Sequence, residues 1–239
     1  EMNVQLLAHS PEAENLITTA AKLCYSKTNA CGIYEKLTEE NVDKFIKMLA
    51  DLGHESPLEH ASFTFAIDGV SRSLLAQITR HRIASFSVQS QRYVNLGDTF
   101  EYITPSIIAS NSMYKELFDE AVNESFEAYK TLTAAITADL VTNGMERKKA
   151  EKIAIENARA VLPNACETKL IVTMNARELM HFFNKRCCNR AQDEIRALAD
   201  EMLRLCKGVA PILFSHAGAP CVSGACPEGK MSCGSPRKG

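Results

Sequence analysis

The sequence predicts a chain of mixed helices and strands, on the evidence of two kinds of hydrophobic spacing. Apolar and polar residues alternate at residues 62–67 and 167–174, as in half-buried strands. At residues 106–141 apolar residues recur instead at the spacing of a long amphipathic helix. With 239 residues, 46% of them hydrophobic, the chain can form a sizeable core in one large domain or two small ones.

The remaining elements follow from local signals. Residues 3–8 are a strand candidate and residues 11–24 a helix, and a second helix is predicted at 38–52, where Thr38 caps an acidic first turn and Gly53 ends it. Residues 95–105 are predicted as loop. A helix at 145–160 follows the break at 143–144 and must end before Pro163. Two more helices are predicted at 175–186 and 191–206.

One stretch carries an unusual charge. Residues 69–97 contain no Asp or Glu, yet they hold His81 and four arginines (Arg72, Arg80, Arg82 and Arg92), in a chain with a formal net charge of -2. Residues 71–82 have helical spacing, which predicts Arg82 on the apolar side of that helix. An arginine directed at a core must be paired or must face a bound anion, because it keeps its proton. The alternative to an anion site is a solvated basic helix end, with its arginines paired to carboxylates from elsewhere in the chain. Residues 85–92 add hydroxyls, amides and a guanidinium, the groups that hold phosphates and nucleobase edges.

Several classes of protein are disfavoured. There is no apolar run near 18 residues and no signal peptide, so we expect a cytoplasmic protein without membrane contact. A net charge near zero argues against general nucleic-acid binding. Nine scattered cysteines favour reduced thiols over a disulfide framework.

Two segments could suggest a metal, and for both we favour none. The loop at 53–60 carries two histidines and two glutamates, but it lacks the helical spacing of the well-defined zinc motifs. The tail after residue 217 is rich in Gly, Pro, Ser and Cys, yet Cys221, Cys226 and Cys233 do not form a Cys-x-x-Cys pair. A loosely packed extension is expected there.

The basic stretch resembles the signature of the flavin-dependent thymidylate synthases. Arg80-His81-Arg82 is followed after seven residues by Ser90, and Gln-Arg-Tyr at 91–93 fits the same pattern. The resemblance extends to the loop at 54–60, to Arg-x-x-Leu-Pro at 159–163 and to a second signature at 175–196, and it covers roughly residues 4–217.

The resemblance implies an α+β fold, with a mixed sheet flanked by long helices. One domain would span residues 2–217, with a C-terminal tail at 218–239, and the chain would form a homotetramer with active sites between subunits. The implied reaction makes dTMP from dUMP for dTTP biosynthesis. Methylenetetrahydrofolate would give the carbon, FADH2 the hydride, and NADPH would regenerate the flavin.

The site residues also come from the resemblance, motif by motif. For FAD they are Ser56, Glu59, Arg80, His81, Arg82, Asn175, Arg177 and His181. For dUMP they are Gln77, Arg80, Gln89, Ser90, Arg92, Arg159 and Arg186, with Arg186 as the catalytic residue that stabilises negative charge on the pyrimidine. Ser90 is interpreted as a hydrogen-bonding group, because no base lies near it in the sequence. The sequence departs from the family pattern at Val88, where many members have an acid, and at His181, where many have Asn.

Two other classes remain open. A non-catalytic nucleotide- or RNA-binding module could use the same arginines and would bind with steep salt dependence. A metal-dependent hydrolase could be built on His54, Glu59 and His60 together with the cysteine-containing tail, and it would lose activity with a chelator.

Overall fold

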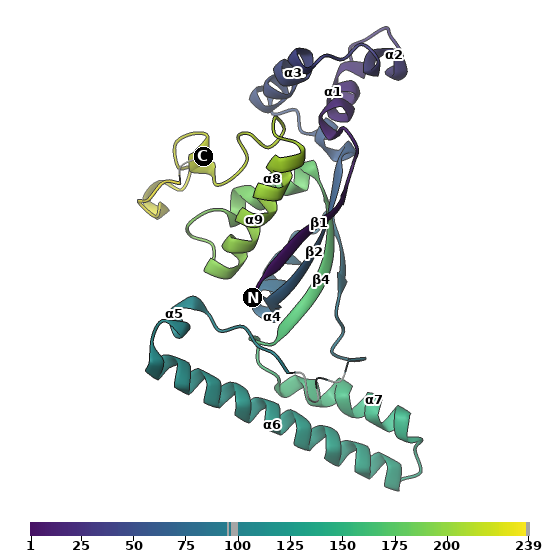
Figure 1. The fold of residues 1–239 in the computed structure, drawn as a ribbon, viewed down its shortest axis with the longest axis vertical. Coiled ribbons are helices and arrows are strands. Elements are labelled where there is room, and N and C mark those ends of the chain that lie inside the picture. Colours follow the sequence, from purple (N-terminus) through teal and green to yellow (C-terminus); the bar gives the residue numbers. More distant parts are fainter. Residues whose placement is uncertain (95, 97–99, 238–239) are drawn as a thin grey trace. The chain divides into compact units, whose positions relative to one another are not determined.

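The computed structural model describes residues 1–94, 96 and 100–237 (Figure 1). The predicted α+β class is confirmed. The elements in chain order are β1 (Asn3–His9), α1 (Ala13–Leu23), α2 (Ala30–Tyr34), α3 (Glu39–Leu52), η1 (Ser56–His60), β2 (Ser62–Ser71), α4 (Arg72–Ile78), β3 (Ala84–Val88), α5 (Ser106–Ala109), α6 (Ser112–Thr142), α7 (Arg147–Ala158), η2 (Arg159–Val161), β4 (Glu167–Asn175), α8 (Ala176–Arg186), α9 (Asp193–Val209), η3 (Pro220–Val222) and η4 (Gly229–Met231).

The chain divides into two compact units. The first unit consists of Asp68–Ala76 and Val88–Leu170, together with Glu1. The second unit consists of Met2–Ile67, Gln77–Ser87 and the chain from Ile171 onward.

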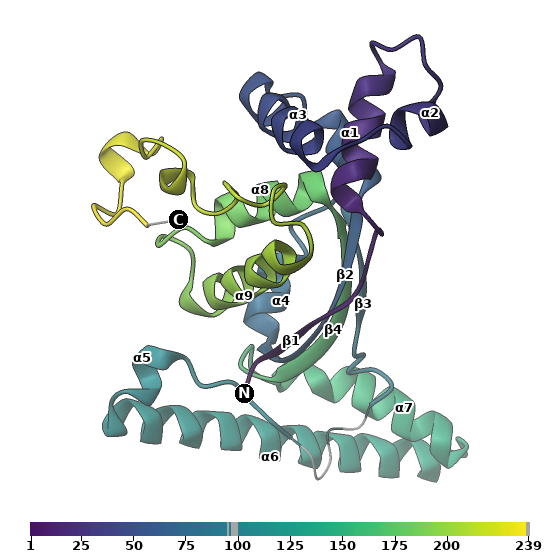
Figure 2. The same ribbon diagram turned by 45° about the horizontal axis from the view of Figure 1, so that its top comes forward.

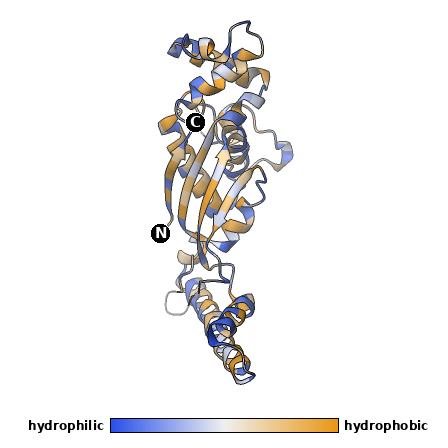
Figure 3. Cartoon of the chain, turned by 90° about the vertical axis from the view of Figure 1, so that its right-hand side faces the viewer, coloured by the Kyte–Doolittle hydropathy of each residue, from blue (hydrophilic) through white to orange (hydrophobic). Residues whose placement is uncertain are grey.

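The second unit is built on β-strands covered by helices. The sheet has the strand order β1-β2-β4-β3 and is antiparallel rather than mixed. Within this unit, Phe63, Phe65 and Ile67 of β2 are fully buried, as the alternation at 62–67 predicts. Helices α8 and α9 lie side by side (Figure 2), and the strands carry many apolar residues (Figure 3). The apolar row of α8, including Leu179 and Phe182, is completely buried.

The start of α8 is fixed by local chemistry. The side chain of Asn175 accepts a hydrogen bond from the backbone N–H of Glu178 at 2.9 Å, so it caps the helix at the end of β4. The backbone N–H of Ala176 also donates to the carbonyl of Ala61 at 2.8 Å. These contacts place the first turn of α8 beside the start of β2.

The first unit contains the long helix pair α6 and α7, which pack along each other (Figure 1). The predicted helix at 106–141 is in fact two helices, because Asn111 caps α6 by accepting from the N–H groups of Met113 and Tyr114. Gly144, with a φ of 90°, makes the turn between α6 and α7. Tyr129 is buried beside Phe126.

Three expectations from spacing need correction. The helix predicted at 71–82 ends at Ile78, so Arg82 is not on an apolar helix face and is exposed. The polar run at 85–92 begins with an unpredicted strand, β3, and the short helix α2 is also unpredicted.

Within the predicted loop at 95–105, Asn95 and residues 97–99 lie outside the described residues. No helix among the described residues is long and apolar enough to cross a membrane.

Candidate functional site

A buried histidine lies at the centre of the candidate site in the second unit. Nδ1 of His81 is 2.9 Å from Oε1 of Glu178, and Nε of Arg186 donates to Nε2 of His81 at 3.2 Å. Nη2 of Arg186 also donates to the backbone carbonyl of Gln77 at 3.2 Å. The side chains of His81 and Glu178 are only 5% and 9% exposed. The loop after α4 and the end of α8 are thus joined by one chain of hydrogen bonds.

Burial shapes the charge of this cluster. It lowers the pKa of His81, and the nearby charge of Arg186 acts in the same direction, whereas the hydrogen bond with Glu178 opposes the shift. Burial, followed by the charge of Arg80, also lowers the pKa of Arg186. A guanidinium nevertheless stays protonated at neutral pH. The cluster therefore combines a neutral imidazole with a fixed positive charge.

A pocket of about 360 Å³ opens beside this cluster. Its lining residues are Arg80, His81, Arg82, Ile83, Glu178, His181, Lys185 and Arg186. Four of them are Lys or Arg, and the single acid, Glu178, is buried and already bonded to His81. The pocket therefore suits a ligand that is anionic or rich in acceptor atoms.

A second group of predicted residues joins η1 to α8. Arg177 donates to Oε2 of Glu55 at 3.0 Å and to Oε1 of Glu59 at 2.6 Å. The hydrogen bond with Glu59 raises the pKa of Arg177. Ser56 opens η1 and lines a smaller pocket of about 150 Å³. These residues lie in one unit, where η1 contacts α8. Ser56 and Glu59 belong to η1, Arg177 belongs to α8, and Asn175 ends β4 and caps α8.

Other predicted residues of the second unit lie around His81. His181 is exposed on α8, and its ring centroid is 5.6 Å from that of His81. The side chain of Gln77 donates to Gln192. Every residue predicted for FAD belongs to the second unit, as do Gln77, Arg80 and Arg186 from the dUMP set.

The first unit holds the remaining residues predicted for dUMP, namely Gln89, Ser90, Arg92 and Arg159. Nε and Nη2 of Arg92 donate to one carboxylate oxygen of Glu156, at 2.9 and 2.7 Å. Nε of Arg159 donates to the backbone carbonyl of Glu156 at 3.2 Å, which satisfies the end of α7 as expected for a basic residue there. The hydrogen bond from Arg92 lowers the pKa of Glu156.

Arg72 adds a third guanidinium to this part of the first unit. Its Nη1 atom is buried and has no hydrogen-bond partner among the described residues. Burial lowers its pKa, and the charge of Arg159 acts in the same direction. A buried N–H without an acceptor is costly, so an anion here would be stabilised.

The segment before Arg92 is ordered by backbone contacts. The N–H of Gln89 donates to the carbonyl of Lys169 at 2.9 Å, next to β3 and β4. The Ser90 hydroxyl accepts from the N–H of Arg92 at 3.2 Å. Val88, a departure from the family pattern, is the last residue of β3 and is partly buried.

Spacing along the chain did not predict Glu178 or Glu156 as functional neighbours, and it gave Arg72 no role. Glu178 meets His81 across 97 residues, so no local pattern reveals the pair. Glu156 lies three residues before Arg159 on α7, and an acid within one turn of a predicted phosphate ligand is a signal that could have been used.

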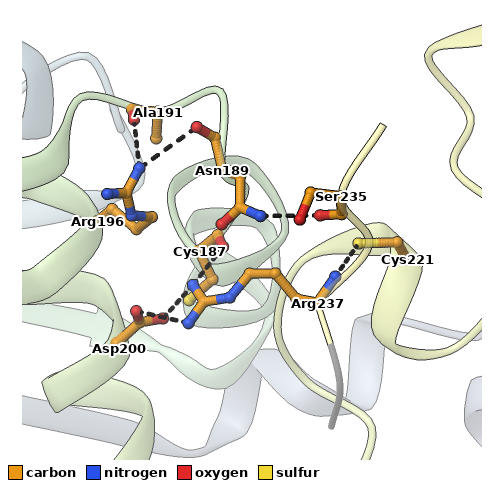
Figure 4. Close-up of polar contacts among 8 residues, drawn as sticks. All are labelled: Cys187, Asn189, Ala191, Arg196, Asp200, Cys221, Ser235 and Arg237. Carbon is orange, nitrogen blue, oxygen red and sulfur yellow. Dashed lines mark hydrogen bonds and ion pairs between the residues drawn. The ribbon is translucent and has the colours of Figure 1, made fainter. Parts of the chain in front are cut away.

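The C-terminal tail makes more contacts than a loose extension would. Arg237 donates to both carboxylate oxygens of Asp200, at 2.8 and 2.9 Å, and to the carbonyl of Cys187 at 2.6 Å (Figure 4). Asn189 donates to the carbonyl of Ser235 at 2.9 Å. The tail and residues 184–191 together line a pocket of about 520 Å³. The tail is thereby held against the segment that follows Arg186.

Three buried cysteines, Cys166, Cys187 and Cys206, are poorly placed to act as nucleophiles. Burial raises the pKa of Cys166 to about 11, and it also raises the pKa of Cys187 and Cys206. A thiol with a raised pKa is a poor nucleophile at neutral pH. Among the described residues, no group of three or more His, Cys, Asp or Glu side chains is placed to hold a metal ion. Glu59, considered above for a metal-dependent hydrolase, instead pairs with Arg177.

Comparison with known proteins establishes the family of this chain. Residues 5–212 match the family described as thymidylate synthase complementing protein. The chain is 54% identical to a flavin-dependent thymidylate synthase of Clostridium tetani, over 98% of this chain and 93% of the relative. It is 49% identical to one of Geobacter sulfurreducens, over 98% and 94% of the two chains. For one of Pyrococcus furiosus the identity is 37%, over 95% and 90%. With nearly the whole chain matched, the protein belongs to the thymidylate synthase complementing protein family, that of the flavin-dependent thymidylate synthases.

Proposed function

We propose that this chain makes dTMP from dUMP, with methylenetetrahydrofolate as the carbon donor, a reduced flavin as the hydride donor, and NADPH as the reductant of the flavin. The observation that carries the proposal is the cationic pocket of the second unit. Arg80, Arg82, Lys185 and Arg186 line it, and its single acidic residue, Glu178, is already bonded to His81. Such a lining matches a flavin dinucleotide, whose pyrophosphate is anionic, and a uracil ring, which presents carbonyl acceptors.

Arg186 is the residue to which we assign the activation of uracil. Its Nε and Nη2 atoms bond to His81 and Gln77, so among the described contacts the Nη1 end remains for a ligand. A fixed guanidinium against N3 and O2 of uracil stabilises negative charge there, which raises the electron density at C5. Because protein acceptors already orient the group, little reorganisation is needed when that charge develops.

We assign FAD to the residues of the second unit named by the resemblance. Arg80 and Arg82 are exposed at the pocket and carry the positive charge that a pyrophosphate needs, and Arg80 also serves dUMP. Arg177, Glu59 and Asn175 fix η1 and the start of α8, and they thereby place Ser56 and His181 for the flavin. The bound flavin supplies the hydride, and the protein supplies position and charge.

We assign the phosphate of dUMP to the first unit. Arg92 and Arg159 both contact Glu156, whose carboxylate takes the place that a phosphate oxygen would take on Arg92. A phosphate carries more charge and more acceptor oxygens than a carboxylate, so it is expected to displace Glu156. The buried Nη1 of Arg72 supports the assignment, because it lacks a partner within the described residues.

The active assembly that we propose is a homotetramer. In such an assembly the phosphate ligands and the pyrimidine ligands of one site need not come from the same copy of the chain. We expect a tetramer in solution, and sedimentation or light scattering of the purified protein tests this directly.

A flavin-binding experiment tests the cofactor assignment. The purified protein is incubated with FAD, desalted, and examined by visible absorption before and after dUMP is added. Retained flavin bands that shift on addition of dUMP support a shared site. A folded protein that retains no flavin at high concentration would contradict the proposal. In that case steep salt dependence of RNA binding would favour the binding-module alternative.

A further inference from the structure

Glu178 is a buried carboxylate to which the resemblance assigns no role. Its side chain is 9% exposed, and its Oε1 atom lies 2.9 Å from Nδ1 of His81. It lies on the first turn of α8, where a negative charge is favourable, but a buried charge there still needs a strong partner. The position of that partner decides what Glu178 does.

The donors and acceptors of the cluster fix the form of the imidazole. Nε of Arg186 can only donate, so Nε2 of His81 must accept and cannot carry a proton. A neutral imidazole then carries its proton on Nδ1, which donates to Oε1 of Glu178. The other tautomer, or a protonated ring, would direct an N–H of His81 at the N–H of Arg186.

We propose that Glu178 is a positioning residue, which holds His81 in the Nδ1–H form so that Nε2 of His81 accepts from Arg186 and orients its guanidinium toward the pyrimidine. The proposal rests on the proposed role of Arg186. His81 then acts between the two charged groups, and both of its ring nitrogens are used by the protein. It therefore contributes to the flavin site through packing and placement, and not through a polar contact of its own.

Glu178 therefore sets the orientation of Arg186 through His81. Arg186 has a long side chain with several rotatable bonds. Its hydrogen bond to the carbonyl of Gln77 is not sufficient by itself to fix the plane of the guanidinium. Loss of Glu178 frees the tautomer of His81, and when the ring proton moves to Nε2, that atom no longer accepts from Nε of Arg186. The positive charge stays in the pocket, so ligand binding should weaken less than turnover.

The test combines Glu178→Ala and Glu178→Gln with the same changes in an Arg186→Ala background. We expect Glu178→Ala to lower the rate of dTMP formation by about 10- to 100-fold, with flavin retention kept. Glu178→Gln, whose amide oxygen can still accept from Nδ1, should lie between it and the wild type. In the Arg186→Ala background, the dissociation constant of dUMP should change by less than about twofold on loss of Glu178, because the residue acts through Arg186.

A matched control is Glu14→Gln. Glu14 is a partly buried carboxylate of the same unit that accepts from the N–H groups of Ile212 and Leu213 at 2.7 and 2.9 Å. Its removal should lower the melting temperature without changing the ratio of turnover to dUMP affinity. Unchanged turnover in Glu178→Ala would overturn the positioning role. So would a loss of dUMP affinity well above twofold that is the same with and without Arg186.

A nitrogen-15 spectrum of the histidine rings separates this inference from the proposed function. It needs no activity and no ligand, and it reports which ring nitrogen of His81 carries the proton. We expect Nδ1–H in the wild type and a mixture of forms in Glu178→Gln. A wild-type ring protonated on Nε2 would refute the inference even if dTMP is formed. An Nδ1–H ring in a protein that makes no dTMP would instead refute the proposed function and leave the contact established.

Discussion

Arg186→Lys is the substitution that probes the proposed chemistry most sharply. Lysine keeps the positive charge, but its ammonium cannot bond Nε2 of His81 and the carbonyl of Gln77 and also present a planar edge to uracil. Each of the two hydrogen bonds has an ionised donor and is worth about 1.5 to 3 kcal/mol. Lysine can keep one of them, so the loss of stability should be about 1.5 to 3 kcal/mol. Losing one preorganised donor to a developing charge costs roughly 100-fold in turnover.

The assay measures turnover, dUMP affinity and melting temperature on the same preparation. We expect turnover of Arg186→Lys to fall roughly 100-fold, with a loss of dUMP affinity below about tenfold and flavin retention unchanged. Arg196→Lys is the matched control, because Nη1 of Arg196 also donates to two acceptors, the carbonyls of Asn189 and Ala191 at 3.3 and 3.2 Å (Figure 4). Turnover within twofold of wild type in Arg186→Lys, or the same fall in both variants, would refute the reasoning.

Three further predictions concern other parts of the chain. Arg92→Ala should weaken dUMP binding by about 10- to 100-fold and leave flavin absorbance intact. Arg204→Ala, which removes a similar exposed pair with Glu201, should not weaken dUMP binding. An equal loss of dUMP and flavin binding in Arg92→Ala would contradict the separate roles of the two sets of arginines. Burial lowers the pKa of His81 below its ordinary value of 6.5, so as the pH falls the unfolded chain binds this proton first, and the stability of the fold should fall below pH 6.5. The charged and titratable groups around His81 are His181, Arg80, Glu178 and Arg186. If the melting temperature of His81→Gln had the same pH dependence as that of the wild type, His81 would not be the cause. Arg237→Ala should free the tail from Asp200 and Cys187, seen as faster proteolysis after residue 217 with the rest of the chain intact; an unchanged cleavage rate would show that this contact does not hold the tail.

Hydrophobic spacing was sufficient for most of the long elements. The alternation at 62–67 and 167–174 predicted β2 and β4, a capping signal at Thr38 predicted the start of α3, and helical spacing predicted α8. The missed elements are short or weakly apolar. In β3 the sequence Ala-Ser-Phe-Ser-Val alternates, but serine at alternate positions hid a strand that lies at the edge of the sheet.

The basic motif was predictable from sequence, but its geometry was not. Spacing alone carried the helix past Ile78 and placed Arg82 on an apolar face, whereas the backbone turns at Arg80 and His81 through bonds to Gln77 and Ile78. The opposite holds for Arg186, which continues the buried row of α8 and is partly buried as the spacing predicts. Its partners could not be read from the sequence, because they lie more than 100 residues away.

The most direct test of the proposed reaction is the formation of dTMP by the purified protein. The reaction contains protein stripped of flavin, dUMP, methylenetetrahydrofolate, NADPH and FAD, and chromatography measures the product as each component is left out in turn. We predict dTMP only in the complete mixture, and almost none when Arg186 is replaced by alanine. No dTMP from folded, flavin-loaded wild-type protein, or dTMP formed equally well without flavin, would contradict this account of the chain.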